Sequence, residues 1–180
     1  METAQSIEAK AQGRKPKIVG PKDGKAGNLG AVGVRFMIDG EETGETFSLV
    51  EHPIPPRQLA APLHIHTRED EYSYVLEGRM GPLLGDEVVY AEPGDLVFKP
   101  RDQWHTFWNP GDTECRILEI ISPAGFEKFF DALADMNAAG PPDPERIVAL
   151  AEEYGHYFDL EGTQRVIAEH GLSFPMLPEE

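Results

Sequence analysis

PLHIHTREDEYSYVLEG, residues 62–78, is the stretch of this 180-residue chain that decides its fold. His64 and His66 are two residues apart, so on an extended strand their side chains project from the same face. After a short polar turn, Glu71 opens a second apolar run, which we expect to return antiparallel beside the first. Both imidazoles can therefore reach one point, next to a strand that begins with a carboxylate.

A later stretch, residues 94–109, reads GDLVFKPRDQWHTFWN and contributes a third histidine at the start of another apolar run. Neutral imidazoles and a carboxylate suit a divalent first-row metal, and three nitrogens with one oxygen leave positions open for a substrate or for oxygen. The spacing therefore predicts a metal site, and no fifth protein ligand is evident. The candidate ligands are His64, His66, Glu71 and His105.

The two stretches follow the patterns HxHxxxxExxxxxxG and GxxxxxPxDxxHxxxN, which resemble the two motifs of the cupin superfamily. The resemblance implies an all-β fold, a jelly-roll barrel or double-stranded β-helix, with those four residues as metal ligands. Two positions depart from the family pattern, because Gln58 and Asp102 stand where glycine is usual. Aspartate is among the few residues that tolerate a left-handed turn conformation, and neither position is a ligand.

Length and composition limit the function further. The chain is long enough for one domain with a full-sized core, and it has no apolar run of membrane-spanning length. A formal net charge of -16 disfavours nucleic acid and anionic membranes as partners. Because Cys115 is the single cysteine and the first residues lack the apolar centre of a secretion signal, we expect a cytoplasmic protein.

The chain divides into three segments that differ in composition and hydrophobic pattern. Residues 1–27 are polar and are expected to form a flexible arm, whereas residues 28–122 contain many short apolar runs separated by turn signals and predict the β-barrel. Residues 123–180 predict a C-terminal helical extension that packs on the barrel. Its first helix carries a phenylalanine stripe with Ser122 as cap, its second begins at Asp143, and a weaker third spans Thr163 to His170.

The remaining histidines are interpreted as structural. His52 precedes a proline and is expected in a loop, and His156 and His170 are expected at the surface of the extension. No carboxylate pair beyond the motif glutamate is apparent. Strand alternation gives a set of candidate pocket residues, weakest on the early strands. They are Phe47, Leu49, Ser73, Val75, Gln103 and Phe107, and Arg57 is added because a sugar-phosphate isomerase would need a cationic side chain in the pocket.

The residues that alternate with the inward-facing ones on the same strands predict an aromatic outer face. If Glu71 and His105 point inward, then Tyr72, Tyr74 and the two tryptophans, Trp104 and Trp108, point outward. An exposed aromatic patch usually marks an interface. We therefore expect the helices or a second subunit to cover it, and we predict a homodimer.

The resemblance extends more loosely to small bacterial cupins of the quercetinase-like group, in which a helical segment similar to PAGFEKFFDAL follows the barrel. It implies a dioxygenase acting on a small aromatic or enol-type substrate with oxygen, in which Glu71 either binds the metal or takes the substrate proton as general base. The alternatives are an oxygen-independent isomerase or decarboxylase and a non-catalytic ligand-binding module. Iron, nickel, manganese, copper and zinc all accept this ligand set.

Overall fold

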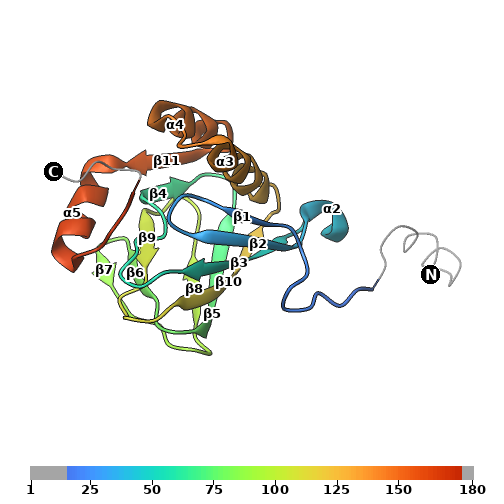
Figure 1. Ribbon diagram of the computed structural model, residues 1–180, viewed down its shortest axis with the longest axis horizontal. Helices are drawn as coiled ribbons and strands as arrows, with labels where there is room; N and C mark the ends of the chain where they lie inside the picture. The colour runs from blue at the N-terminus through green and yellow to red at the C-terminus, as the bar shows by residue number, and fades with distance from the viewer. Residues whose placement is uncertain (1–15, 176–180) are drawn as a thin grey trace, which may run out of the picture.

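Two antiparallel sheets enclose the core of the protein, as shown by a computed structural model that describes residues 16–175 (Figure 1). Because the inward side chains of both sheets are apolar, a buried cluster containing Val75, Ile117 and Phe107 fills the space between them. The fold is the predicted jelly-roll barrel with a C-terminal helical extension. The first sheet has the order β1 (Ala26–Asn28), β2 (Gly33–Ile38), β3 (Ser48–Ile54), β10 (Cys115–Ser122), β5 (Asp70–Glu77) and β8 (Leu96–Lys99); the second has β11 (His156–Asp159), β4 (Leu63–His66), β9 (His105–Trp108), β6 (Gly81–Leu84) and β7 (Glu87–Val88).

Strict alternation on β10 sets which of its side chains face the interior. Cys115, Ile117, Glu119 and Ile121 are buried, and the residues between them are half-buried. This is the period-2 pattern of a strand with one face in a core. An inward glutamate in such a strand is costly unless it is paired, so Glu119 marks a polar site inside the barrel.

Three helices form most of the extension: α3 (Glu127–Ala139), α4 (Pro144–Glu153) and α5 (Leu160–His170). Phe126, Phe129 and Leu133 lie in one buried cluster with side chains of β2 and β3, so α3 packs on the first sheet. Asp143 caps α4 as predicted, by accepting a hydrogen bond from the amide of Glu145. None of the helices described is long and apolar enough to span a bilayer.

Three local expectations were wrong. The first helix begins at Glu127, with Phe126 as its N-cap, so Ser122 does not cap it and instead ends β10. Within the segment expected to contain only strands and turns, Gly40–Thr43 form a single helical turn, α2. The extension also contains a strand, β11, which the four residues HYFD form between two helices by pairing with β4.

The predicted flexible arm, residues 1–27, lies partly outside the described residues, which begin at residue 16. Within the described part, Arg35 donates hydrogen bonds to the carbonyls of Gly20 and Asp23 at 3.0 and 3.1 Å. Strand β1 then pairs with β2. The last residues of the predicted arm are therefore joined to the first sheet.

Candidate metal centre

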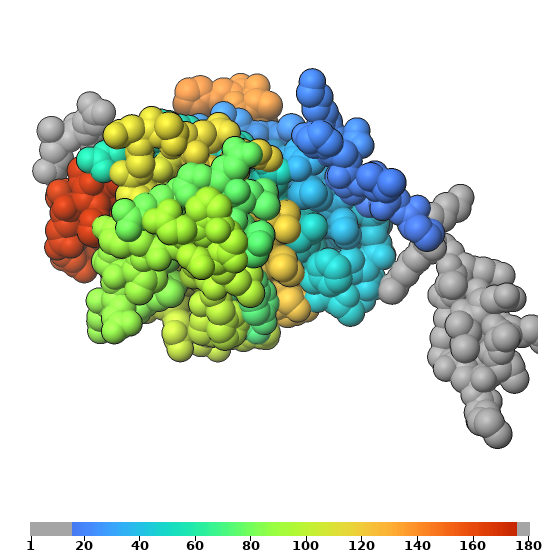
Figure 2. All heavy atoms as spheres, turned by 90° about the horizontal axis from the view of Figure 1, so that it is seen from below, coloured from blue at the N-terminus to red at the C-terminus, as the bar shows by residue number. Residues whose placement is uncertain are grey.

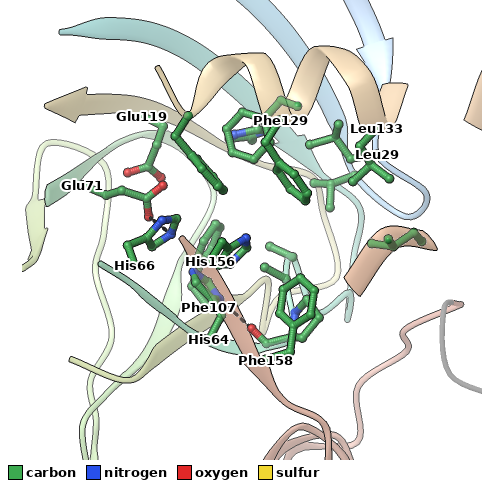
Figure 3. A pocket seen from close by; sticks show the side chains of 18 of the residues that line it. Leu29, His64, His66, Glu71, Phe107, Glu119, Phe129, Leu133, His156 and Phe158 are labelled. Carbon is green, nitrogen blue, oxygen red and sulfur yellow. Dashed lines mark hydrogen bonds and ion pairs between the residues drawn. The ribbon is translucent and has the colours of Figure 1, made fainter. Parts of the chain in front are cut away.

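The four predicted ligands come from three strands and converge inside the barrel. His64 and His66 share the inward face of β4, His105 lies directly opposite His64 on β9, and Glu71 reaches the same place from β5 of the other sheet. One ligand atom from each residue can be chosen so that all four lie within 4.8 Å of one another. All four side chains are buried. The structure thus brings the predicted set together, with Glu71 approaching His66 in Figure 3.

The three imidazole rings are held through their Nδ1 atoms. His64 Nδ1 is 2.6 Å from the Pro62 carbonyl, and His105 Nδ1 is 3.1 Å from the Gln103 carbonyl. His66 Nδ1 is 2.6 Å from Glu69 Oε1. Each acceptor favours a proton on Nδ1, which leaves the lone pair on Nε2.

The Nε2 atoms of His66 and His105 are buried and have no hydrogen-bond partner within residues 16–175. Glu71 Oε2 lies 3.5 Å from the first and 3.4 Å from the second. Orphaned ring nitrogens facing a carboxylate are what a metal site offers, because the cation would satisfy all of them at once. These residues therefore fit a divalent metal.

A buried ion network holds Glu71. Lys99 Nζ lies 2.9 Å from Glu71 Oε2 and 3.0 Å from Glu119 Oε2, and Ser73 donates to Glu119 at 2.8 Å. The expectation of a single inward carboxylate was therefore wrong. Strand register could have revealed the network, because Lys99 is paired with Glu71 and Glu119 with Ser73.

The network separates the pKa values of its two carboxyl groups. Burial alone would raise the pKa of Glu71, but Lys99 and the neighbouring histidines hold it well below its usual value. Burial raises the pKa of Glu119 to about 7, and the charge of Glu71 adds to this effect while Lys99 opposes it. Burial would lower the pKa of Lys99, yet its two carboxylate partners raise it. Lys99 and Glu71 thus form the charged pair, and Glu119 is the carboxyl group that takes up a proton first as the pH falls.

A further histidine belongs to this cluster. His156 was expected at the surface, but it is 4 % exposed and lies on β11 opposite His66, with the two ring centroids 4.5 Å apart. The expectation failed because β11 was not recognised in the sequence. The alternation of side chains in HYFD was the only sequence signal for this strand. Burial, reinforced by the neighbouring imidazoles, holds the pKa values of His156 and His64 well below normal, so both rings are neutral.

His52 also departs from its expected place. It lies within β3 rather than in a loop, is buried, and has Nδ1 3.0 Å from the Gly33 carbonyl. Its ring packs edge-on against Phe130 at 5.1 Å. Pro53 is tolerated in the strand because it is paired with β10 but with no residue of β2.

A cavity of about 60 Å³ lies beside the cluster, between the barrel and the extension. Its wall is mostly apolar, and the extension supplies much of it through α3, α4 and β11. No lysine or arginine is among the described residues that line it. The main apolar wall residues are Leu29, Val32, Phe107, Phe126, Phe129, Phe130, Leu133, Ile147 and Phe158, and the polar ones are His52, His64, His66, Glu71, Glu119 and His156.

Of the predicted pocket residues, Phe107 lines this cavity and the others lie elsewhere. The Ser73 hydroxyl donates a hydrogen bond to Glu119, and Val75 belongs to the barrel core. Phe47 is 36 % exposed and Leu49 is half-buried, because Ser48, Val50 and His52 occupy the inward positions around them. Gln103 is exposed, and Arg57 is exposed and donates to the Pro110 carbonyl.

Both departures from the motif glycines have a structural role. Asp102 has φ 62°, which confirms the left-handed turn that the family's glycine would provide. The side-chain amide of Gln58 donates to the Leu59 carbonyl at 3.2 Å and to the Ser173 carbonyl. Gln58 therefore joins the barrel to the end of the extension.

Comparison with known proteins agrees with this fold. Residues 51–121 match the family model described as Cupin domain. The polyketide cyclase RemF from Streptomyces resistomycificus is 30% identical in sequence, with a TM-score of 0.53 over 60% of this chain and 80% of that one. A sugar phosphate isomerase of the cupin superfamily from Silicibacter pomeroyi is 20% identical, with a TM-score of 0.52 over 59% of this chain and 75% of that one. The latter likeness concerns the fold alone.

Two curated relatives match a shorter region. The tetracenomycin polyketide synthase protein TcmJ of Streptomyces glaucescens is 33% identical over 60 residues, which are 33% of this chain and 40% of that protein. The polyketide synthase CurC of Streptomyces cyaneus is 35% identical over 60 residues, which are 33% of this chain and 39% of that protein. The chain therefore matches only about two fifths of the length of these relatives.

The two sheets and the inward histidines between them define a jelly-roll barrel with a cluster that could hold a metal ion. The chain belongs to the cupin family, as the RemF likeness and the Cupin domain match establish.

Proposed function

We propose that this chain is a metal-dependent enzyme that binds a small, neutral, enolisable compound, such as a β-diketone or a phenol. The observation that carries the proposal is the position of the His64, His66, Glu71 and His105 cluster beside a mainly apolar cavity. An apolar pocket with a few converging polar groups is the usual form of a small-molecule site.

A divalent cation held by these four residues would supply a Lewis acid that favours the deprotonated form of an enol or phenol. The protein's own groups prepare the site for this chemistry. Glu69 and two backbone carbonyls orient the imidazoles, Lys99 orients the Glu71 carboxylate, and the phenylalanines of α3 exclude water.

Charge favours a neutral substrate. The cavity wall contains Glu71 and Glu119 but no cationic side chain among its described residues, and Lys99 behind it is bound to both carboxylates. Apart from the proposed metal, the wall offers a phosphate or a free carboxylate no partner that would replace its hydration. We therefore disfavour a phosphorylated sugar as the substrate.

We favour a non-oxidative reaction at the carbon beside the carbonyl, such as cyclisation, loss of water or isomerisation. The support is the similarity to RemF, a polyketide cyclase, and to two proteins of polyketide synthases. The size of the cavity limits the similarity of substrate that can be inferred from these proteins, because a cavity of about 60 Å³ holds only a few water molecules. A cavity of about 150 Å³ is the size that holds one benzene ring, so even a one-ring ligand would enter only if side chains of the extension moved. A multi-ring polyketide would need a much larger movement, so the proposed substrate has at most one ring.

A dioxygenase is the second candidate. The same donor set leaves positions open, and an apolar cavity admits dioxygen as readily as it admits an organic ligand. The two reactions differ in whether oxygen is consumed, which makes them separable by experiment.

The first test is metal content. Protein purified without a histidine tag should contain a divalent metal, and replacing His64 and His66 together by alanine should abolish it because two of the converging nitrogens are lost. His170→Ala, a histidine change outside the cluster, is the matched control and should retain the metal. Equal metal content in the double variant and the parent would remove the basis of the proposal.

Turnover then decides the reaction. The metal-loaded protein should convert 2,6-heptanedione, an enolisable diketone, into 3-methylcyclohex-2-enone and water in the absence of oxygen, and His105→Ala should lose this activity. Oxygen uptake with a β-diketone or catechol, and no anaerobic conversion, would replace the cyclase-type reaction by the dioxygenase.

A further inference from the structure

His156 is the polar group that the extension contributes to the cavity wall. Strand β11 pairs with β4 so that His156 lies opposite His66 and Phe158 lies opposite His64. The side chains of His156 and Phe158 both line the cavity, whereas Tyr157 between them points outward and is 44 % exposed. Figure 3 shows the His156 ring between His66 and Phe129.

Both ring nitrogens of His156 are buried and have no hydrogen-bond partner among residues 16–175. The ring is surrounded by other rings instead. Their centroids lie at 4.5 Å for His66, 4.6 Å for His64, 4.7 Å for Phe158 and 4.9 Å for Phe126. A buried polar group without a partner is costly, so its persistence in a cavity points to a ligand that supplies the partner.

His156 therefore differs from the other cluster histidines. The Nδ1 atoms of His64, His66 and His105 all have a fixed protein acceptor, and these three residues converge with Glu71, whereas His156 is not part of that converging group. A neutral imidazole offers one donor and one acceptor, the pair that a hydroxyl group can satisfy. Among the described residues, the wall offers no cation to accompany an anionic ligand.

We propose that His156 hydrogen-bonds the hydroxyl or enol oxygen of the ligand, and that the cavity selects a neutral, hydroxylated ring over an apolar ring of the same size. This assignment rests on the proposed function for the identity of the site, but it concerns ligand binding and not the metal. It names His156 as a specificity-determining residue.

Phenol and toluene are suitable probes, because they differ by a hydroxyl in place of a methyl group. Their dissociation constants are measured by calorimetry on the metal-free full chain, treated with a chelator. Replacing His156 by phenylalanine should weaken phenol relative to toluene by about tenfold, the effect of one hydrogen bond. Tyr157→Phe, on the same strand but facing outward, should leave the ratio unchanged.

Stability gives a second readout, which separates ligand binding from a structural role. Phenylalanine suits the aromatic surroundings and removes the unpartnered nitrogens, so His156→Phe should leave the melting temperature unchanged or raise it by about 2–4 °C. A fall of several degrees would show that His156 is a structural group and would overturn the assignment.

Two binding results would also overturn it: an unchanged phenol-to-toluene ratio in His156→Phe, or binding of neither probe by the parent protein at millimolar concentration. Because these measurements use metal-free protein, they are independent of the metal test. Loss of the proposed metal function would leave the phenol preference intact, and loss of the phenol preference would leave the metal content intact.

Discussion

At the scale of single residues, Lys99 is the group on which the buried network depends. Replacing it by methionine leaves two buried carboxyl groups without their cation, and removal of one partner of a buried ion pair typically costs about 3–5 kcal/mol. We expect urea unfolding of metal-free Lys99→Met to show a loss of this order. Lys99→Met combined with Glu119→Gln should recover part of it, because one buried carboxyl group is then removed.

Although Lys99→Met should lower the stability of the protein, it should raise the affinity for metal. Lys99 and a cation compete for Glu71 Oε2, so Lys99→Met should bind a divalent ion such as Ni²⁺ more tightly, by about tenfold or more. Calorimetric titration of parent and variant with Ni²⁺ measures this. Equal affinities would mean that Lys99 does not oppose metal binding at Glu71.

These residues also show where sequence reasoning about the site succeeds and where it fails. The convergence of His64, His66 and Glu71 was predictable because they lie within one short stretch, and strand alternation fixes the direction of their side chains. Lys99 and Glu119 were not predicted, because their roles depend on which strands become neighbours. Only the pairing of β5 with both β8 and β10 places them beside Glu71.

At the scale of elements, hydrophobic pattern and turn chemistry predicted the barrel strands and the helices of the extension. Asp143 and Gly171 show why: a capping side chain and a glycine with φ 60° mark helix ends locally. Strand β11 was missed because four residues carry too little periodicity, and only the open edge of β4 makes them a strand. Because β11 was not predicted, the position of His156 beside the cluster was not predicted either.

The phenylalanine stripe of α3 gives the prediction for this scale. Phe129 is buried and contacts the rings of Phe126, Tyr154 and His156, so it joins three parts of the extension to the cavity. Phe129→Ala should lower the free energy of unfolding by about 3–5 kcal/mol through lost burial and a residual cavity. Lys128→Ala, exposed on the same helix, should change it by less than about 0.5 kcal/mol. Equal unfolding curves for both variants would show that the extension contributes no packing energy.

At the scale of the whole molecule, the predicted aromatic outer face divides into a covered part and an open part. Trp108 is buried, with His170 of α5 stacked on it at 4.5 Å, so the extension covers that region. On the first sheet, Tyr72 and Phe98 stack at 4.9 Å, and Tyr74 is paired with Leu96. Figure 2 shows segments in the green shades of β5 to β8 spread over the visible surface, with red α5 at one side.

This outer surface of β5 and β8 is the basis of the proposed homodimer. Tyr74, Leu96 and Phe98 are 39, 57 and 49 % exposed, which is unusual for adjacent large apolar side chains unless a partner covers them. Light scattering at micromolar concentration should therefore give twice the 19.9 kDa mass of one chain. Leu96→Glu combined with Phe98→Glu should yield monomers, because two charges cannot be buried unpaired at such an interface. Tyr157→Glu places a charge on the other sheet and should leave the dimer intact; a single-chain mass for the parent protein would refute the dimer.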